Sequence, residues 1–188
     1  LAGNPDLLKA HDNNGWNAMI LAVREGRVEV INAILEKNID LLKEHDNDGW
    51  NAMTLAVQEG SVEVINAILE KTPDLLIEED KRGWNAMTLA VKEGRVEVIN
   101  AILEKTSDLL IEQDKRGWNA ITLAASEGRV EVINAILASN SDLLKVLNND
   151  WNAMTVAAKE GVVEVINAIL ASNSGLLKEH DNNGWNAM

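Results

Sequence analysis

Tryptophan recurs at a fixed interval along this chain of 188 residues. The six tryptophans stand at positions 16, 50, 84, 118, 151 and 185, so they are separated by 34, 34, 34, 33 and 34 residues. Regular spacing of this length indicates a repeat array, in which each unit is one supersecondary motif that stacks on its neighbours. Dividing the chain before each turn predicts a single repeat domain over residues 1–188. Its partial units are 1–11 and 181–188, and its complete units are 12–45, 46–79, 80–113, 114–147 and 148–180.

The first complete unit shows why each repeat is expected to fold as two short helices. The turn sequence of residues 12–15 ends in Asn-Gly, which accepts positive φ angles. Asn17 stands where an N-cap residue precedes an apolar segment at 18–25, which Gly26 ends. Apolar spacing predicts a second helix over 28–37. Helices this short cannot bury their apolar faces alone, so the sequence predicts an all-α solenoid of stacked helix-turn-helix units.

The order of motifs within a unit resembles that of a known family. The turn Asp-x-x-Gly-Trp, the helix start Asn-Ala-Met-x-Leu-Ala, a Gly and the segment Glu-Val-Ile-x-x-Ile-Leu follow one another in the first three complete units. The fourth unit has Ile121 in place of Met, and the fifth has an altered turn and Val156 in place of Leu. This order is similar to the ankyrin repeat signature, and the resemblance extends into both partial units. It implies an ankyrin-like solenoid with hairpin-like turns, or fingers, beside a concave binding groove. The tetratricopeptide repeat shares the period of 34 but requires an earlier Gly and a Tyr, and this chain contains no Tyr.

Three features depart from that signature. Asn replaces the family's Thr at the cap and Ala replaces its Pro, so Asn must act as the N-cap. The period is 34 rather than the family's usual 33. The family's usual Gly-Ala after the second helix is absent. A separate irregularity lies in the fifth unit, where the turn at 147–150 is one residue shorter and has Asp150 in place of Gly, which predicts the least regular finger.

The sequence contains no residue pattern that is typical of a catalytic site. There is no cysteine, no phosphate-binding glycine loop and no nucleophile motif, and the three histidines precede turn positions where solvated loop residues are expected. We therefore predict no catalytic, cofactor-binding or metal-binding residue, and no enzyme activity. Without an apolar run of about 20 residues we expect no membrane association, and the lack of cysteine is compatible with an intracellular, cytoplasmic location. The formal net charge of −13 argues against a nucleic acid partner.

Charge is distributed unevenly among the repeats. The complete units carry formal charges of −2, −7, −1, 0 and −2 in chain order. A basic strip begins in the third unit and continues into the fourth, which predicts a docking surface for a protein that presents carboxylates. The predicted partner-binding residues are Asp48, Trp50, Lys81, Arg82, Trp84, Lys92, Arg95, Lys115, Arg116, Trp118 and Arg129.

Each of these features also has a structural explanation. The strip is equally explained as a solvated face whose charges drifted after duplication. For the tryptophan column, packing against the neighbouring finger is favoured over binding, and both roles can hold together. Single-stranded nucleic acid stacking on the same tryptophans is the rival ligand for the strip.

Three classes of function remain open from the sequence. The first is a non-catalytic scaffold or protein interaction module that binds a protein partner through the fingers and the concave helix face. The second is a structural or self-assembling segment with weak end-to-end contacts, for which Leu7, Leu8, Trp185 and Met188 supply apolar surface. The third is the targeting arm of a larger multidomain protein.

Overall fold

The computed structural model describes residues 5–81, 83–114, 117–146, 151–172 and 184. Within these ranges the regular secondary structure consists of ten α-helices and five 3-10 helices, with no β-strand. The helical repeat architecture predicted from the sequence is therefore confirmed. The altered turn at 147–150, Trp185 and Met188 lie outside the described residues, so the irregular fifth finger stays a prediction.

Every complete repeat contributes two α-helices. The first helices of the repeats are α1 (Ala18–Arg24), α3 (Ala52–Glu59), α5 (Ala86–Glu93), α7 (Ala120–Ser126) and α9 (Ala153–Glu160). The second helices are α2 (Val28–Leu35), α4 (Val62–Lys71), α6 (Val96–Leu103), α8 (Val130–Ser139) and α10 (Val163–Ser172). The 3-10 helices are η1 (Pro5–Lys9), η2 (Ile39–Leu42), η3 (Pro73–Leu76), η4 (Asp108–Leu110) and η5 (Ser141–Lys145).

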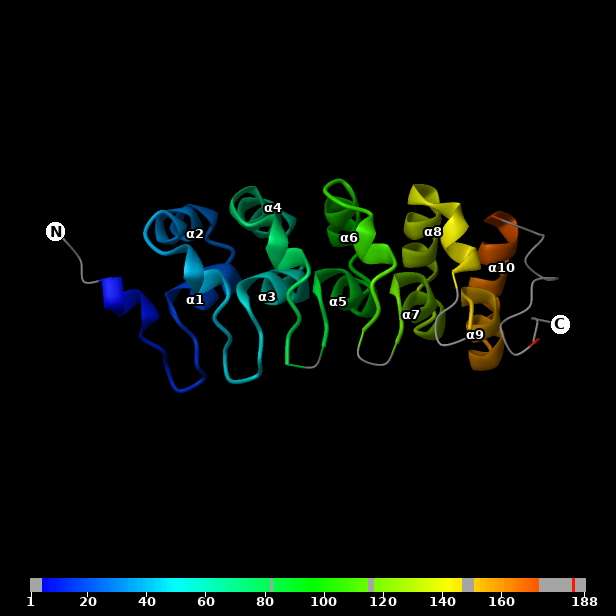
Figure 1. Ribbon diagram of the computed structural model, residues 1–188, viewed down its shortest axis with the longest axis horizontal. Helices are drawn as coiled ribbons and strands as arrows, with labels where there is room; N and C mark the ends of the chain where they lie inside the picture. The colour runs from blue at the N-terminus through cyan, green and yellow to red at the C-terminus, as the bar shows by residue number, and fades with distance from the viewer. Residues whose placement is uncertain (1–4, 82, 115–116, 147–150, 173–183, 185–188) are drawn as a thin grey trace. The chain divides into compact units, whose positions relative to one another are not determined.

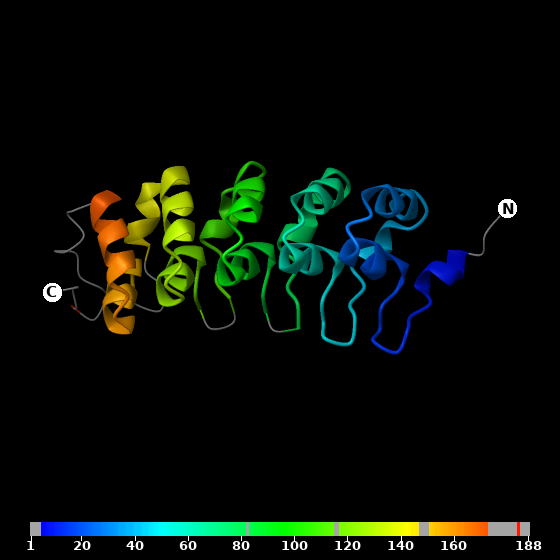
Figure 2. The same ribbon diagram turned by 180° about the vertical axis from the view of Figure 1, so that it is seen from behind.

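The chain forms two compact units, residues 1–89 and 90–188, and α5 begins in the first and ends in the second. In the first unit α1 packs against α2 and α3, while α4 packs against α2 and α3. In the second unit α6 packs against α8, α7 against α8 and α9, and α10 against α8 and α9. In both units the second helices form one layer, the first helices form the other, and the fingers extend from the side of the first helices (Figures 1 and 2). The prediction of one repeat domain over residues 1–188 stays a prediction.

Asparagine caps the first helices, as the sequence predicts. In α3 the Oδ1 atom of Asn51 accepts a hydrogen bond of 2.9 Å from the Thr54 N–H, and the Asn51 N–H donates to Thr54 Oγ1 over 3.0 Å. This reciprocal pair satisfies two of the backbone donors that a helix start leaves open. In α1 Ile20 stands in the place of the threonine, so only the bond from its N–H to Asn17 remains, at 2.9 Å.

The core lies between the two helix layers of each unit. Met19, Met53, Met87 and Met154 occupy equivalent positions in four repeats and are buried, as is Ile121 at the same position in the fourth repeat. The Leu-Leu pairs of η2, η3, η4 and η5 are buried as well, with Leu41 and Leu42 fully inaccessible. Each connection between repeats is therefore part of the packed structure rather than a free loop.

Candidate functional site

The fingers of the first four repeats are each closed by the aspartate that begins them. The Asp12 N–H donates to the Trp16 carbonyl and the Gly15 N–H donates to the Asp12 carbonyl, each over 3.0 Å. The Asp12 carboxylate accepts bonds from the N–H groups of Asn14, at 2.8 Å, and Trp16, at 2.9 Å. Chiefly because of the Trp16 bond, the pKa of the Asp12 carboxyl lies below its ordinary value of 3.8.

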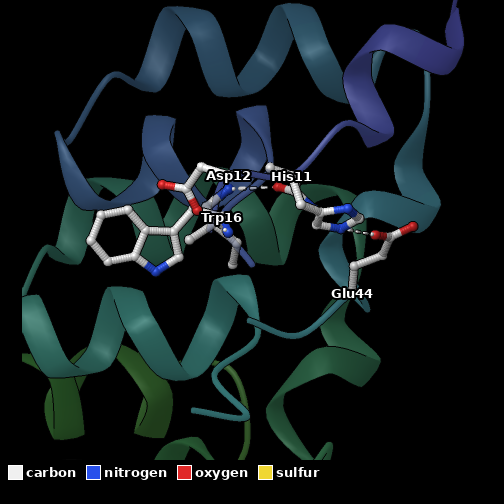
Figure 3. A network of polar contacts seen from close by, with 6 residues as sticks. His11, Asp12, Trp16 and Glu44 are labelled. Carbon is white, nitrogen blue, oxygen red and sulfur yellow. Dashed lines mark hydrogen bonds and ion pairs between the residues drawn. The ribbon is translucent and has the colours of Figure 1, made fainter. Parts of the chain in front are cut away.

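The tryptophan of this finger points away from the residue that precedes the aspartate. Figure 3 shows the indole of Trp16 and the imidazole of His11 on opposite sides of Asp12. The His11 ring instead faces the following connection, where its Nε2 lies 3.1 Å from Glu44 Oε2. The histidine position thus links one finger to the next connection and leaves the other side of the finger to Trp16.

Hydrogen bonds connect the first two fingers at their bases and at their tips. The Trp16 Nε1 donates to Asp46 Oδ2 over 3.3 Å, and the Asp46 Oδ1 accepts bonds from the N–H groups of Asp48 and Trp50. At the tip, the Asn47 N–H donates to the Asn14 carbonyl over 3.1 Å. The Asp46 carboxylate is buried with three donors, so Trp16 has the structural role that the sequence left open.

A groove lies between these two fingers and the ends of α1 and α3. Its cavity volume is about 430 Å³, and it is lined by Trp16, Arg24, Asp46, Asp48, Trp50, Leu55, Gln58 and Glu59. Two of the residues predicted to bind a partner, Asp48 and Trp50, therefore face one concave surface. The Arg24 guanidinium lies 4.3 Å from the centroid of the Trp16 ring, within the range of a cation–π contact.

The groove is negatively charged. Its lining contains three carboxylates and one guanidinium. Asp46 is buried, whereas Asp48 and Glu59 are exposed. The two repeats that form the groove have formal charges of −2 and −7, so the field from more distant groups has the same sign.

The side chains of the predicted basic strip are partly engaged within the fold. Lys81 is exposed, but its alkyl chain lies across the preceding finger, because a Cβ atom added at Gly49 would be 2.5 Å from Lys81 Cγ. The Lys81 Nζ donates to the Asn47 carbonyl over 3.5 Å. Arg129 is half-buried, and its Nη2 donates over 2.7 Å to the carbonyl of Lys92, in the last turn of α5.

The remaining strip residues are distributed over both compact units. Trp84 belongs to the first unit with Lys81, while Lys92, Arg95, Trp118 and Arg129 belong to the second. All of these except Lys81 are half-buried. The other predicted strip residues, Arg82, Lys115 and Arg116, lie outside the described residues.

Sequence reasoning missed the helix-end residues of the groove. Arg24 and Gln58 each stand eight residues after a tryptophan, and the same spacing brings Lys159 Nζ to 5.1 Å from the centroid of the Trp151 ring. A comparison of this position across the repeats would have connected the finger with the end of the helix behind it. The residues at this position are Arg24, Gln58, Lys92, Ser126 and Lys159.

Beyond the groove, the described part of the chain has a further cavity but no cluster for a metal ion and no membrane-spanning helix. No group of three His, Cys, Asp or Glu side chains is arranged there to hold a metal ion. No helix there has the length and apolarity needed to cross a membrane. A second cavity of about 440 Å³ opens between α6 and α8, with mostly small or apolar lining: Asn100, Leu103, Glu104, Ala135, Ala138 and Ser139.

Comparison with known proteins identifies the repeat. A family model described as ankyrin repeats, three copies long, matches residues 2–78, 40–112 and 74–146. These overlapping matches extend from residue 2 to residue 146 and include both fingers of the groove. No curated protein is similar enough to this chain to be matched.

Proposed function

Because the chain belongs to the ankyrin repeat family, we propose that it is a non-catalytic module that binds a protein partner through its fingers and the groove beside them. Ankyrin repeats are generally protein–protein interaction modules and are typically non-catalytic. An intracellular scaffold role is part of this proposal. It is supported by the absence of cysteine and by the length of repeat surface that the sequence contains.

The observation that carries the proposal is the groove over α1 and α3. Tryptophan and arginine are enriched among the residues that dominate interface energies, and Trp16, Trp50 and Arg24 meet there. The Trp16 side chain is already fixed by its bond to Asp46 and by its contact with Arg24. A surface held in place before binding loses less conformational entropy when a partner docks.

Capture of proteins from a cell lysate tests this proposal. We expect Gln58→Trp, which places a bulky side chain in the groove, to abolish capture of partners that the wild-type chain retains. Glu63→Trp is the matched control, because Glu63 is exposed on α4 and does not line the groove. Identical sets of proteins on the wild-type chain and on the Gln58→Trp variant would contradict the proposal.

The same experiment tests the predicted basic strip. Reversing the charges of Arg82 and Arg116 removes the proposed attraction for carboxylates without altering the groove lining. Loss of capture in this variant, with capture retained by Gln58→Trp, would place the partner on the strip. The opposite pattern would place it in the groove.

Self-association is a second candidate function, and exposed leucines favour it. Leu7 is 71% exposed and Leu21 is 42% exposed, although the residues equivalent to Leu21 in the next repeats, Leu55 and Leu89, are buried. A second copy could cover this apolar surface. Light scattering across a concentration series tests this alternative, because a constant monomer mass would exclude weak self-association in that range.

A further inference from the structure

We infer that the groove over α1 and α3 receives a basic segment of the partner, with a lysine or arginine side chain placed between the carboxylates of Asp48 and Glu59. This inference rests on the proposed function and specifies the chemistry of the partner. It differs from the expectation drawn from the basic strip, which calls for a partner that presents carboxylates.

The carboxylates of the groove have different roles. Asp46 is buried and its oxygens accept three hydrogen bonds from the fingers, so it serves the fold. Asp48 and Glu59 are exposed, and no ion pair joins either of them to a lysine or arginine in the described part of the chain. Their charges are therefore available to a ligand.

Among the described residues that line the groove, the only cation belongs to the first repeat. Arg24 lies over the Trp16 ring, whereas its equivalent in the second repeat is the neutral Gln58. The second repeat thus contributes acidic groups and no basic group to the lining. The contact between Arg24 and Trp16 also shows that an indole face of this groove accommodates a guanidinium at 4.3 Å from its centroid.

Charge at longer range selects the same ligand. The repeat that supplies Asp48, Trp50 and Glu59 has a formal charge of −7, the most negative of the five complete repeats. A basic peptide is attracted before contact, while an acidic peptide or a nucleic acid is repelled. The attraction weakens with salt because exposed charges are screened over about 8 Å at physiological ionic strength.

Peptide binding by the full chain tests the inference directly. The probes are fluorescein-labelled peptides of four Gly-Ser-Arg, Gly-Ser-Gln or Gly-Ser-Glu triplets, titrated in low and high salt with fluorescence anisotropy as the readout. We expect the arginine peptide to bind at least about tenfold more tightly than the glutamine peptide in low salt. We expect no binding of the glutamate peptide.

Two double variants separate the groove from the general charge of the repeat. Asp48→Asn with Glu59→Gln should weaken binding of the arginine peptide by roughly five- to tenfold. Glu70→Gln with Asp74→Asn removes the same charge from the same repeat at exposed positions outside the groove lining, so binding should fall by about twofold or less. Circular dichroism establishes that all variants keep the helical fold.

Several results would overturn the inference. The first is an equal loss of affinity for the arginine peptide in the two double variants. The second is a glutamate peptide that binds more tightly than the arginine peptide. The third is an arginine peptide that does not bind, or an oligothymidine, titrated as a further probe, that binds in its place. Groove-dependent capture from lysate combined with no binding of the arginine peptide would refute this inference and leave the proposed function intact. Binding of the arginine peptide without any groove-dependent protein capture would refute the proposed function alone.

Discussion

The indole nitrogen of Trp16 donates a hydrogen bond to the carboxylate of Asp46, so the tryptophan of one finger is held by the aspartate that closes the next. The same tryptophan lines the groove and stacks against Arg24. One side chain therefore serves both the joint between repeats and the candidate binding surface. The packing interpretation of the tryptophan column holds at this position, and the binding interpretation stays a prediction.

A double-mutant cycle on Trp16 and Asp46 measures this joint. Trp16→Phe keeps an aromatic ring for Arg24 but removes the donor to Asp46, so we expect the free energy of unfolding to fall by about 1 kcal/mol. Asp46→Asn should also destabilise, and the double variant should lose less than the sum of the two single variants. Urea denaturation supplies the free energies. Additive effects would show that the 3.3 Å contact contributes nothing to stability.

Gly49 is expected to tolerate alanine far less well than Gly26. Both residues have positive φ angles, +87° and +64°, so each substitution costs about 1 kcal/mol in backbone strain. At Gly49 the new methyl group would also overlap the Lys81 side chain, which adds about 1–3 kcal/mol, whereas nothing lies within 4 Å at Gly26. Thermal unfolding compares the variants. Addition of Lys81→Gly should recover much of the extra loss, and equal losses for Gly49→Ala and Gly26→Ala would refute the close packing.

The pH dependence of stability should carry a contribution from Asp12. Its folded-state pKa lies below the ordinary 3.8, so its ionised form stabilises the fold fully above that value. This contribution is lost as the pH falls through the lower folded-state pKa. The difference in unfolding free energy between the wild-type chain and Asp12→Asn should therefore be constant near neutral pH and shrink below about pH 4. A carboxyl titration by NMR with a midpoint above 3.8 would contradict this.

Replacement of Arg129 is expected to lower the stability of the fold. Arg129→Ala removes the 2.7 Å bond to the Lys92 carbonyl and should lower the free energy of unfolding by about 1–2 kcal/mol. Arg27 occupies the same position in the first repeat but is exposed. We therefore expect Arg27→Ala to change the free energy of unfolding by less than about 0.5 kcal/mol. Chemical denaturation of both variants provides the comparison. Similar values for the two would show that the contact with α5 does not stabilise the fold.

The fold followed closely from the sequence because its signals are local. Apolar spacing, asparagine caps and a terminating glycine predict helices over 18–25 and 28–37, and the structure has them at Ala18–Arg24 and Val28–Leu35. These signals predict no element at Leu41 and Leu42, yet the two residues belong to a 3-10 helix and are buried. That burial comes from neighbouring helices, which propensity alone does not describe.

The candidate site was less accessible to sequence reasoning. Comparing near-identical repeats selects Asp48, because the tip residues differ, but it gives no reason to place Arg24 and Glu59 beside it. Those residues meet only because the finger folds back along the ends of α1 and α3. The same comparison treats Arg129 as surface charge, although its guanidinium reaches the preceding repeat across Gly94.

Among the described residues, the contacts between fingers join positions about one repeat apart and reach no further. Asn47 bonds to Asn13 and Lys81 to Asn47, each across 34 residues. A copied repeat therefore brings with it both halves of the joint that it needs, one for the preceding neighbour and one for the following neighbour. Insertion or loss of a whole unit would re-form the same joints, whereas insertion of a few residues would break them. A gene encoding such an array can change its number of units in single steps and still encode a chain that folds.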